Sequence, residues 1–319
     1  MRMIQLLLAA APTLAAAELN FLVMADWGGQ PTAPFTTAAE ISTAGGMGRM
    51  AETMNASFAL AVGDNFYSSG IKTDMNDPRF KHTFEDVFVA DSLQGPGFPF
   101  YVIAGNHDHG GNVTAQIAYT QKSNRWTYPA SWYTFSRDLG GGATLQVVMI
   151  DTVILSGNSD VRNEAGELTH ELRGSELPGP ADPLHATSQL QWLEATLAAS
   201  KATFLVVAGH FPIWSICEHG PTAAMIKTVK PLLERYHVTA FIAGHDHCME
   251  SFVCENGSFE PFIYKCDPFT KTGSGQTQGK LKKDYRFIRL TAGWTTTAWG
   301  RPTQTTRRRR TSPRCRTAR

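Results

Sequence analysis

Five apolar runs in this chain each end in a short segment that offers Asp, Asn, Tyr or His. An apolar run of strand length followed by Gly and a polar side chain is typical of a buried strand that ends in a tight loop. Helix-like segments separate the runs, so the sequence predicts a layered α/β fold whose polar loops meet at one sheet edge. The five segments are Asp26-Trp27-Gly28, Gly63-Asp64-Asn65-Phe66-Tyr67, Gly105-Asn106-His107-Asp108, Gly209-His210 and Gly244-His245-Asp246-His247.

The side chains in these segments are metal-ligand types. A single Asp or His after a strand is usually a turn or cap residue, but five such segments together indicate a shared site. Oxygen donors mixed with neutral imidazole suit iron, manganese or zinc, and the candidates are too many for one tetrahedral ion. Two ions that share a carboxylate would use them all, and two-metal sites are typical of displacement at phosphorus. The candidate ligands are Asp26, Asp64, Tyr67, Asn106, His210, His245 and His247.

In residue type, order and spacing, the five segments resemble the motif blocks of the purple acid phosphatases, which are calcineurin-like metallophosphoesterases. The resemblance is to the small, tartrate-resistant type in particular and runs from about Leu19 to about Met249. Tyr67 supports it, because serine/threonine phosphatases of the same superfamily carry Asp-Arg-Gly after their Gly-Asp. Further matching segments are Asp151-Thr152-Val153, Gly157-Asn158-Ser159-Asp160 and the stretch from Trp214 to Pro221.

The resemblance implies a four-layer α/β/β/α sandwich of two mixed β-sheets flanked by helices. It weakens after Met249, so the end of the second sheet stays unassigned, although Phe259–Tyr264 and Tyr285–Leu290 have the composition of strands. Elsewhere we expect a helix at 36–55 that is interrupted near Gly45-Gly46. We also expect a long surface loop at 156–187 and one helix at 221–236.

The resemblance also assigns roles to the candidate residues. It gives Asp26, Asp64, Tyr67 and His247 to a ferric ion, and Asn106, His210 and His245 to a divalent ion (Fe, Zn or Mn), with Asp64 bridging. It makes His107 and His219 catalytic: they would bind phosphate oxygens or protonate the departing alcohol. The alternative for His219 is a plain surface histidine.

The expected function is that of an acid phosphatase, which hydrolyses phosphate monoesters by attack of a metal-bound hydroxide at an Fe(III)–M(II) centre and releases inorganic phosphate. Two alternatives remain open at this point. One is another binuclear metallophosphoesterase that acts on phosphodiesters or pyrophosphate. The other is an inactive secreted protein that binds polyanions.

The two ends of the chain differ in composition from its body. Residues 1–17 combine Arg2, an apolar stretch and Ala15-Ala16-Ala17, which predicts a secretory signal peptide, and residues 18–300 would form the catalytic domain. Residues 301–319 hold eight of the chain's 29 basic side chains and no acid, which leaves 21 basic against 28 acidic side chains in residues 1–300. We interpret the arginine-rich end as a solvated, disordered tail and expect no nucleic-acid partner.

Other features fit a secretory route. Three acceptor sequons predict N-glycans at Asn55, Asn112 and Asn256. No later apolar run is long enough to predict a membrane span. We therefore expect a secreted or lysosomal/vacuolar monomer. Among the five cysteines, Cys248 and Cys254 are the pair that the sequence suggests for a disulfide in an oxidising compartment.

Overall fold

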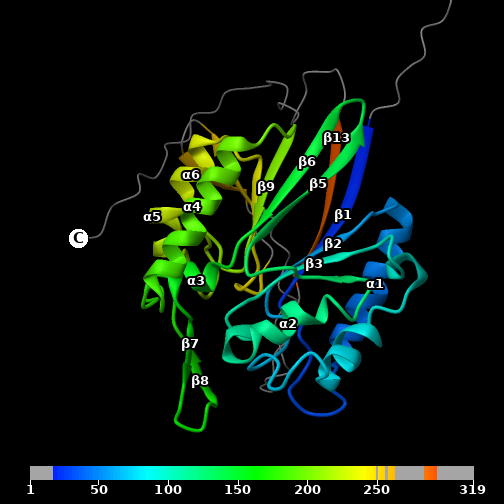
Figure 1. The fold of residues 1–319 in the computed structure, drawn as a ribbon, viewed down its shortest axis with the longest axis vertical. Coiled ribbons are helices and arrows are strands. Elements are labelled where there is room, and N and C mark those ends of the chain that lie inside the picture. The colour runs from blue at the N-terminus through cyan, green and yellow to red at the C-terminus, as the bar shows by residue number, and fades with distance from the viewer. Residues whose placement is uncertain (1–16, 249–250, 256–257, 263–283, 293–319) are drawn as a thin grey trace, which may run out of the picture.

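The computed structural model describes residues 17–248, 251–255, 258–262 and 284–292, and shows two β-sheets packed face to face between helical layers (Figure 1). This is the predicted α/β/β/α arrangement. In pairing order, the first sheet consists of β13 (Asp284–Ala292), β1 (Ala17–Ala25), β2 (Ala59–Val62), β3 (Phe100–Ile103) and β4 (Trp126–Thr127). The second consists of β10 (Ala240–Ile242), β9 (Phe204–Ala208), β6 (Ala143–Met149) and β5 (Tyr133–Gly140).

Both sheets are mixed, as predicted. In the first, β1 to β4 are parallel and β13 runs antiparallel to β1; in the second, β6, β9 and β10 are parallel and β5 is antiparallel to β6. Parallel strands of one sheet end at the same edge. The loops that follow β1, β2 and β3 therefore lie together, as do the loops that follow β9 and β10.

The helices cover the outer faces of the two sheets (Figure 1). In the figure, α1 and α2 lie beside the first sheet, whereas α3 to α6 lie beside the second. Two further hairpins stand apart from the sheets. The helices are α1 (Ala38–Met54), α2 (Val113–Tyr119), α3 (Thr152–Ser156), α4 (Pro183–Ala199), α5 (Ala223–Thr228) and α6 (Lys230–Arg235), and the hairpins pair β7 (Asp160–Arg162) with β8 (Leu168–Glu171) and β11 (Ser251–Glu255) with β12 (Ser258–Phe262).

The alternation of side chains along the second sheet divides the core into two parts. Val147 and Val206 belong to the core that the two sheets share, whereas Val148 and Val207 pack with α4 residues such as Leu193. Successive residues of a strand point to opposite faces, so a strand buried on both sides reads as a continuous apolar run. Burial of these strands on both faces explains why the sequence contains continuous apolar runs at their positions.

Helix α1 is continuous, so the predicted interruption near Gly45-Gly46 is wrong. Thr37 and Glu40 form a reciprocal capping box at its start, and Met47 is fully buried against the core. A glycine inside a helix costs about 1 kcal/mol. Capping and core packing outweigh that cost here.

Two other predictions of local structure need correction. Residues 156–187 are only partly a loop, because they contain the β7–β8 hairpin and the start of α4, where Asp182 accepts from the backbone N–H groups of Leu184 and His185. Residues 221–236 form two short helices rather than one. The break lies at Val229, just before Pro231, whose ring cannot continue a helix that precedes it.

The segments after Met249 partly match the expected strands. Phe259–Tyr264 overlaps β12, and Tyr285–Leu290 lies within β13. Strand β13 pairs with β1 over its whole length, from Ala17 opposite Ala292 to Ala25 opposite Asp284. It therefore extends the first sheet, whereas the sequence analysis looked for missing strands in the second.

The expected signal peptide lies almost wholly outside the described residues, and the arginine-rich tail lies outside them entirely; both stay predictions. Among the helices of the described part, none is long and apolar enough to cross a membrane.

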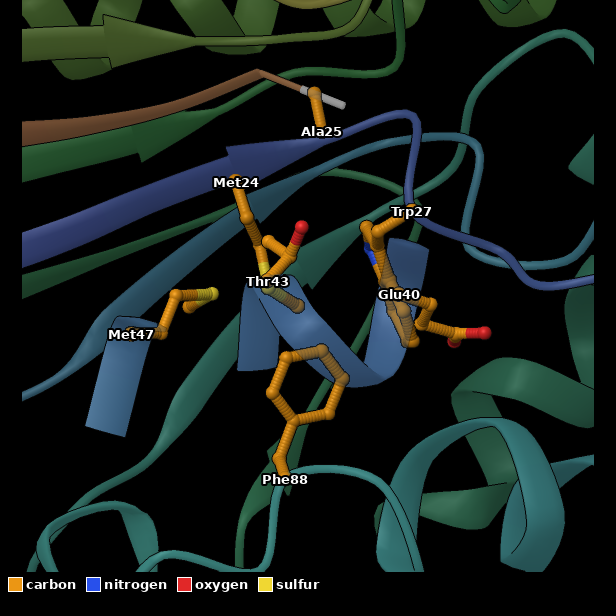
Figure 2. Close-up of a pocket in the computed structure, with 7 residues that line it drawn as sticks. All are labelled: Met24, Ala25, Trp27, Glu40, Thr43, Met47 and Phe88. Atoms are coloured by element: carbon orange, nitrogen blue, oxygen red, sulfur yellow. The ribbon is translucent and has the colours of Figure 1, made fainter. Parts of the chain in front are cut away.

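A small cavity lies between β1 and α1 (Figure 2). Its volume of about 10 Å³ is near the minimum needed for one water molecule. Its lining is mainly apolar and includes Met24, Trp27 and Phe88, together with Glu40 of the capping box. This cavity is a packing feature of α1 and is too small for a substrate.

The buried guanidinium of Arg125, which directly precedes β4, binds the segment between β2 and β3. Arg125 is 4% exposed, and its guanidinium donates to the carbonyl oxygens of Phe88 (2.7 Å) and Leu93 (3.1 Å). It also forms an ion pair with Glu85 and lies 4.8 Å from the ring centre of Phe84. Replacing Arg125 with Met would leave these acceptors buried and unpaired. We expect Arg125→Met to lower the free energy of unfolding by about 3 kcal/mol in urea denaturation.

The matched control is Arg235→Met. Arg235 pairs with Glu194 at the surface, where both side chains are well exposed, and such pairs contribute roughly 0–1 kcal/mol. Equal losses in the two variants would contradict the structural role of Arg125.

Candidate metal centre

The predicted ligands come together where the two sheets place the ends of their strands. Asp26 follows β1, Asp64 follows β2 and Asn106 follows β3, whereas His210 follows β9 and His245 follows β10. Asp26, Asp64, Asn106 and His210 are at most 1% exposed. The fold therefore gathers, at a buried junction, residues that lie up to about two hundred positions apart.

The backbone turns sharply at this junction. Asp26, Asp64, His245 and His247 have φ values of 57°, 54°, 74° and 49°, in the left-handed region that residues with a side chain rarely adopt. Such conformations cost of order 1–3 kcal/mol each and cluster at functional sites. The tight turns direct four candidate ligands inward at a cost in stability.

One group of side chains surrounds the phenol of Tyr67. The Tyr67 hydroxyl lies 3.0 Å from His247 Nε2 and 3.5 Å from Asp26 Oδ1, and His247 Nε2 lies 3.4 Å from Asp26 Oδ1. Ligand atoms of Asp26, Asp64 and His247 all lie within 4.8 Å of one another. This group could hold one ion.

A second group forms around His210. Its Nε2 lies 2.9 Å from Asn106 Oδ1 and 3.4 Å from Asp64 Oδ1, and its ring centre lies 5.2 Å from that of His245. The other ring nitrogen, Nδ1, lies 2.9 Å from the carbonyl oxygen of Val62, which fixes the direction of the ring. A second contact of this kind commonly orients metal-binding histidines.

Asp64 belongs to both groups. Its Oδ1 accepts from the backbone N–H of His107 at 3.1 Å. Its buried Oδ2 lies 3.8 Å from His107 Nε2 and has no hydrogen-bond partner among the described residues. A buried carboxylate oxygen without a partner is costly. Metal ions held by the two groups would remove that cost, so these residues fit a metal centre.

The pKa shifts of Asp64 and Tyr67 also favour a bound cation at the junction. Burial would raise the pKa of Asp64, but the imidazoles of His210 and His107 outweigh it and lower the pKa, so the carboxylate is ionised. Burial and the Asp26 carboxylate raise the pKa of Tyr67 well above its usual value. Tyr67 could therefore become a phenolate only next to a strong positive charge such as a metal ion.

His107 and His219 face a common carboxylate that the sequence analysis missed. His107 Nε2 lies 3.4 Å from Glu171 Oε1, and His219 Nε2 lies 3.6 Å from Glu171 Oε2. Burial alone would lower the pKa of His107, but the nearby carboxylates, Asp64 first, raise it to about 11. Glu171 is the last residue of β8. No motif adjoins it in the sequence, and the prediction of a loop at 156–187 gave no reason to expect the hairpin that positions it.

Two further aspartates organise the centre. Asp160, in β7, accepts from Asn106 Nδ2 at 2.7 Å and so turns the Asn106 oxygen toward His210. Asp108 accepts from the backbone N–H groups of Asn65, Phe66 and Gly105. Both residues lay inside segments that the sequence analysis quoted, but it assigned them no role, because their partners are distant in the chain.

The disulfide differs from the expected one. Cys248 bonds to Cys217, not to Cys254, and joins the loop after β9 to the loop after β10. The sequence suggested the neighbouring cysteine, but the fold brings together two residues that are 31 positions apart.

Comparison with known proteins identifies the family. A family model described as calcineurin-like phosphoesterase matches residues 19–249. The chain is 45% identical over 246 residues to tartrate-resistant acid phosphatase type 5 of Rattus norvegicus, covering 77% of this chain and 71% of the relative. The chain belongs to the calcineurin-like phosphoesterase family. The predicted resemblance and the prediction of a metal-dependent phosphoesterase are confirmed.

Other relatives of this phosphoesterase carry similar names. It is 44% identical over 240 residues to tartrate-resistant acid phosphatase type 5 of Homo sapiens, covering 75% of this chain and 70% of the relative. It is 32% identical to purple acid phosphatase 7 of Arabidopsis thaliana, over 73% of this chain and 65% of the relative. Among solved structures it is similar to GAP50, the anchor in the inner membrane complex of Plasmodium, with a TM-score of 0.61, 24% identity and coverage of 77% and 71%. The likeness to GAP50 shows the fold alone.

The close packing at the junction leads to a test. A Cβ atom on Gly105 would lie 2.3 Å from Asp64 Oδ1 and 2.5 Å from Asp64 N, and backbone cannot move aside as a flexible side chain can. We expect Gly105→Ala to displace Asp64, to lower metal content measured by elemental analysis, and to reduce activity by about 100-fold or more.

Gly97→Ala is the control, because no atom of the described residues lies within 4 Å of the position that its Cβ would take. A Gly105→Ala protein with full metal content would show that the junction tolerates more space than the structure allows.

Proposed function

We propose that this phosphoesterase is an acid phosphatase that hydrolyses phosphate monoesters at a centre of one Fe(III) and one divalent ion. The observation that carries the proposal is the pair of ligand groups that meet at Asp64, whose buried Oδ2 has no hydrogen-bond partner among the described residues. The names of the relatives, which are acid phosphatases and purple acid phosphatases, support the same substrate class.

The donor atoms suggest how the two ions would be shared. Carboxylates and a phenolate offset the larger charge of a ferric ion, whereas imidazoles and an amide oxygen suit a divalent Fe, Zn or Mn ion. The ferric ion would be held by Asp26, Asp64, Tyr67 and His247, and the divalent ion by Asn106, His210, His245 and the shared Asp64. When bound, such a pair of ions activates water and neutralises charge on the phosphoryl group.

The side chains facing this centre do the remaining work. His107 and His219 approach one point, marked by the Glu171 carboxylate that lies between them. An anionic phosphoryl group that replaced the Glu171 carboxylate at that point would receive hydrogen bonds from both imidazoles, and either can donate a proton to the departing alkoxide. Asp160 keeps Asn106 in the orientation that its role as a ligand requires.

We also propose a secretory destination, either outside the cell or in a lysosomal or vacuolar compartment. The Cys217–Cys248 disulfide supports this, because disulfides persist in oxidising compartments. Of the predicted glycan sites, Asn55 is exposed at the end of α1, Asn112 caps α2 with its side-chain oxygen, and Asn256 lies outside the described residues. We propose that the protein is a monomer, and that it binds a phosphomonoester as substrate and inorganic phosphate as product.

The decisive experiment combines colour, metal content and substrate preference. A phenolate bound to ferric iron absorbs visible light, so we expect the purified protein to be coloured and to contain iron. We expect Tyr67→Phe to lose the absorption band, and the wild-type protein to hydrolyse 4-nitrophenyl phosphate much faster than bis(4-nitrophenyl) phosphate.

Tyr101→Phe is the matched control, because the Tyr101 hydroxyl contacts Arg137 away from the centre. A colourless wild-type protein without iron, or an unchanged spectrum in Tyr67→Phe, would overturn the ferric assignment. A preference for the diester would replace the monoesterase with one of the alternative activities.

A second prediction concerns Glu171, which carries negative charge where phosphate would bind. Removing a like charge from the neighbourhood of a bound anion is worth about 1 kcal/mol in a partly solvated site, or about fivefold in affinity. We expect Glu171→Gln to lower the inhibition constant of inorganic phosphate by about that factor in competition assays at constant pH.

Glu164→Gln serves as the control, because Glu164 is exposed near the tip of the same hairpin. An unchanged constant in Glu171→Gln would mean that the carboxylate turns away when phosphate binds.

A further inference from the structure

The Cys217–Cys248 disulfide joins the two sides of the proposed active site. Cys217 lies two residues before His219, and Cys248 directly follows His247. One half-cystine is therefore next to a proposed metal ligand, and the other is close to a proposed substrate-binding histidine. Neither β9 nor β10 includes these residues, so the bond links two loops rather than two elements of a sheet.

Weaker contacts connect the same loops, and two of those in the described part of the chain involve His219 directly. The backbone N–H of His219 donates to Asp246 Oδ1 at 2.6 Å. The ring of His219 stacks on that of His245, with centres 4.3 Å apart and planes 28° apart. The ring of His219 also lies 6.1 Å from that of His247. Together with the disulfide, these contacts determine the position of His219 relative to the segment from His245 to Cys248.

The loop that carries His219 has limited support from the core. Ile216 is 59% exposed and Glu218 is exposed, whereas the His219 side chain is 13% exposed and the buried residues of the loop lie on either side, at Ile213, Ser215 and Thr222. A loop with few buried contacts opens locally at low cost in free energy. The position of His219 therefore depends on the connections to the neighbouring loop, together with the backbone N–H of Gly174, which donates to the His219 carbonyl at 2.8 Å, and the contact with Glu171.

From this arrangement we propose that the disulfide is a positioning device for His219: it holds the imidazole at the distance from the metal-binding loop that phosphate binding and proton donation require. The proposal rests on the proposed function, because it takes His219 to act on the substrate. Cys217 and Cys248 are positioning residues and touch no substrate. Displacing a catalytic group by about 1 Å can cost about 100-fold in rate, so a covalent tether at this point has a large effect on turnover.

The test uses the full-length, metal-loaded protein and four variants: Cys217→Ser, Cys248→Ser, His219→Ala and the double variant Cys217→Ser/His219→Ala. We expect each cysteine variant to lower kcat for 4-nitrophenyl phosphate by about tenfold, and His219→Ala by about 100-fold. If the disulfide acts through His219, its removal changes little once His219 is absent. The double variant should then match His219→Ala within about twofold.

Three further measurements accompany the kinetics: metal content, the midpoint of thermal unfolding and the number of free thiols. We expect the metal content of both cysteine variants to equal that of the wild type, since every proposed ligand is retained. Cys315→Ser is the control for the exchange itself, because Cys315 follows every motif in the sequence and lies outside the described residues.

Two outcomes would overturn the proposal. Losses that multiply in the double variant would show that the disulfide acts independently of His219. Loss of metal or of cooperative unfolding in both cysteine variants would show that the bond stabilises the fold as a whole. Failure of the proposed function would be recognised separately, in a wild-type protein that contains no iron or does not hydrolyse the monoester.

Discussion

The buried carboxylate of Asp64 is the constraint on which the rest of the centre depends. It lies where the edges of the two sheets meet, with one oxygen accepting a hydrogen bond from the His107 backbone and the other without a hydrogen-bond partner in the described part of the chain. A chain tolerates such a group only if the surrounding residues, and finally a cation, compensate its charge. The absence of a Cβ atom at Gly105 lets backbone approach this carboxylate, and its absence at Gly63 leaves room for the ring of His210. The left-handed turn at Asp64 and the hydrogen bond from Gly105 to Asp108 hold the same backbone in place.

The proposed ligands and the proposed substrate-binding residues have different kinds of support. The ligands sit on short turns at the ends of buried strands, and the core holds those strands on both faces. His219 and Glu171 belong instead to a long loop and to a hairpin at the surface (Figure 1). The metal side of the site is thus held by packing, whereas the substrate side depends on a disulfide, a hydrogen bond and ion pairs. A change in those few contacts can alter catalysis without unfolding the protein.

Much of the fold could be predicted because strands buried on both faces leave continuous apolar runs, and each run here ended at a recognisable motif. Prediction failed where local sequence competes with distant contacts. Gly45-Gly46 suggested a break in α1, but packing of Met47 and the capping box hold the helix together. Polar residues 156–187 suggested a loop, but Arg162 anchors a hairpin there through Ser69 and Ser68. The roles of Asp160 and Glu171 were missed for the same reason.

The sequence by itself determined the layered α/β architecture, the residue types of the centre and their order, because strand periodicity and ligand chemistry are local properties. Only the tertiary structure decided which residues meet. It brought Asp64 close to both His247 and His210, placed Glu171 between His107 and His219, and paired Cys217 with Cys248 rather than Cys254. These pairings depend on how two sheets place loops that lie far apart in the chain, and no local pattern carries that information.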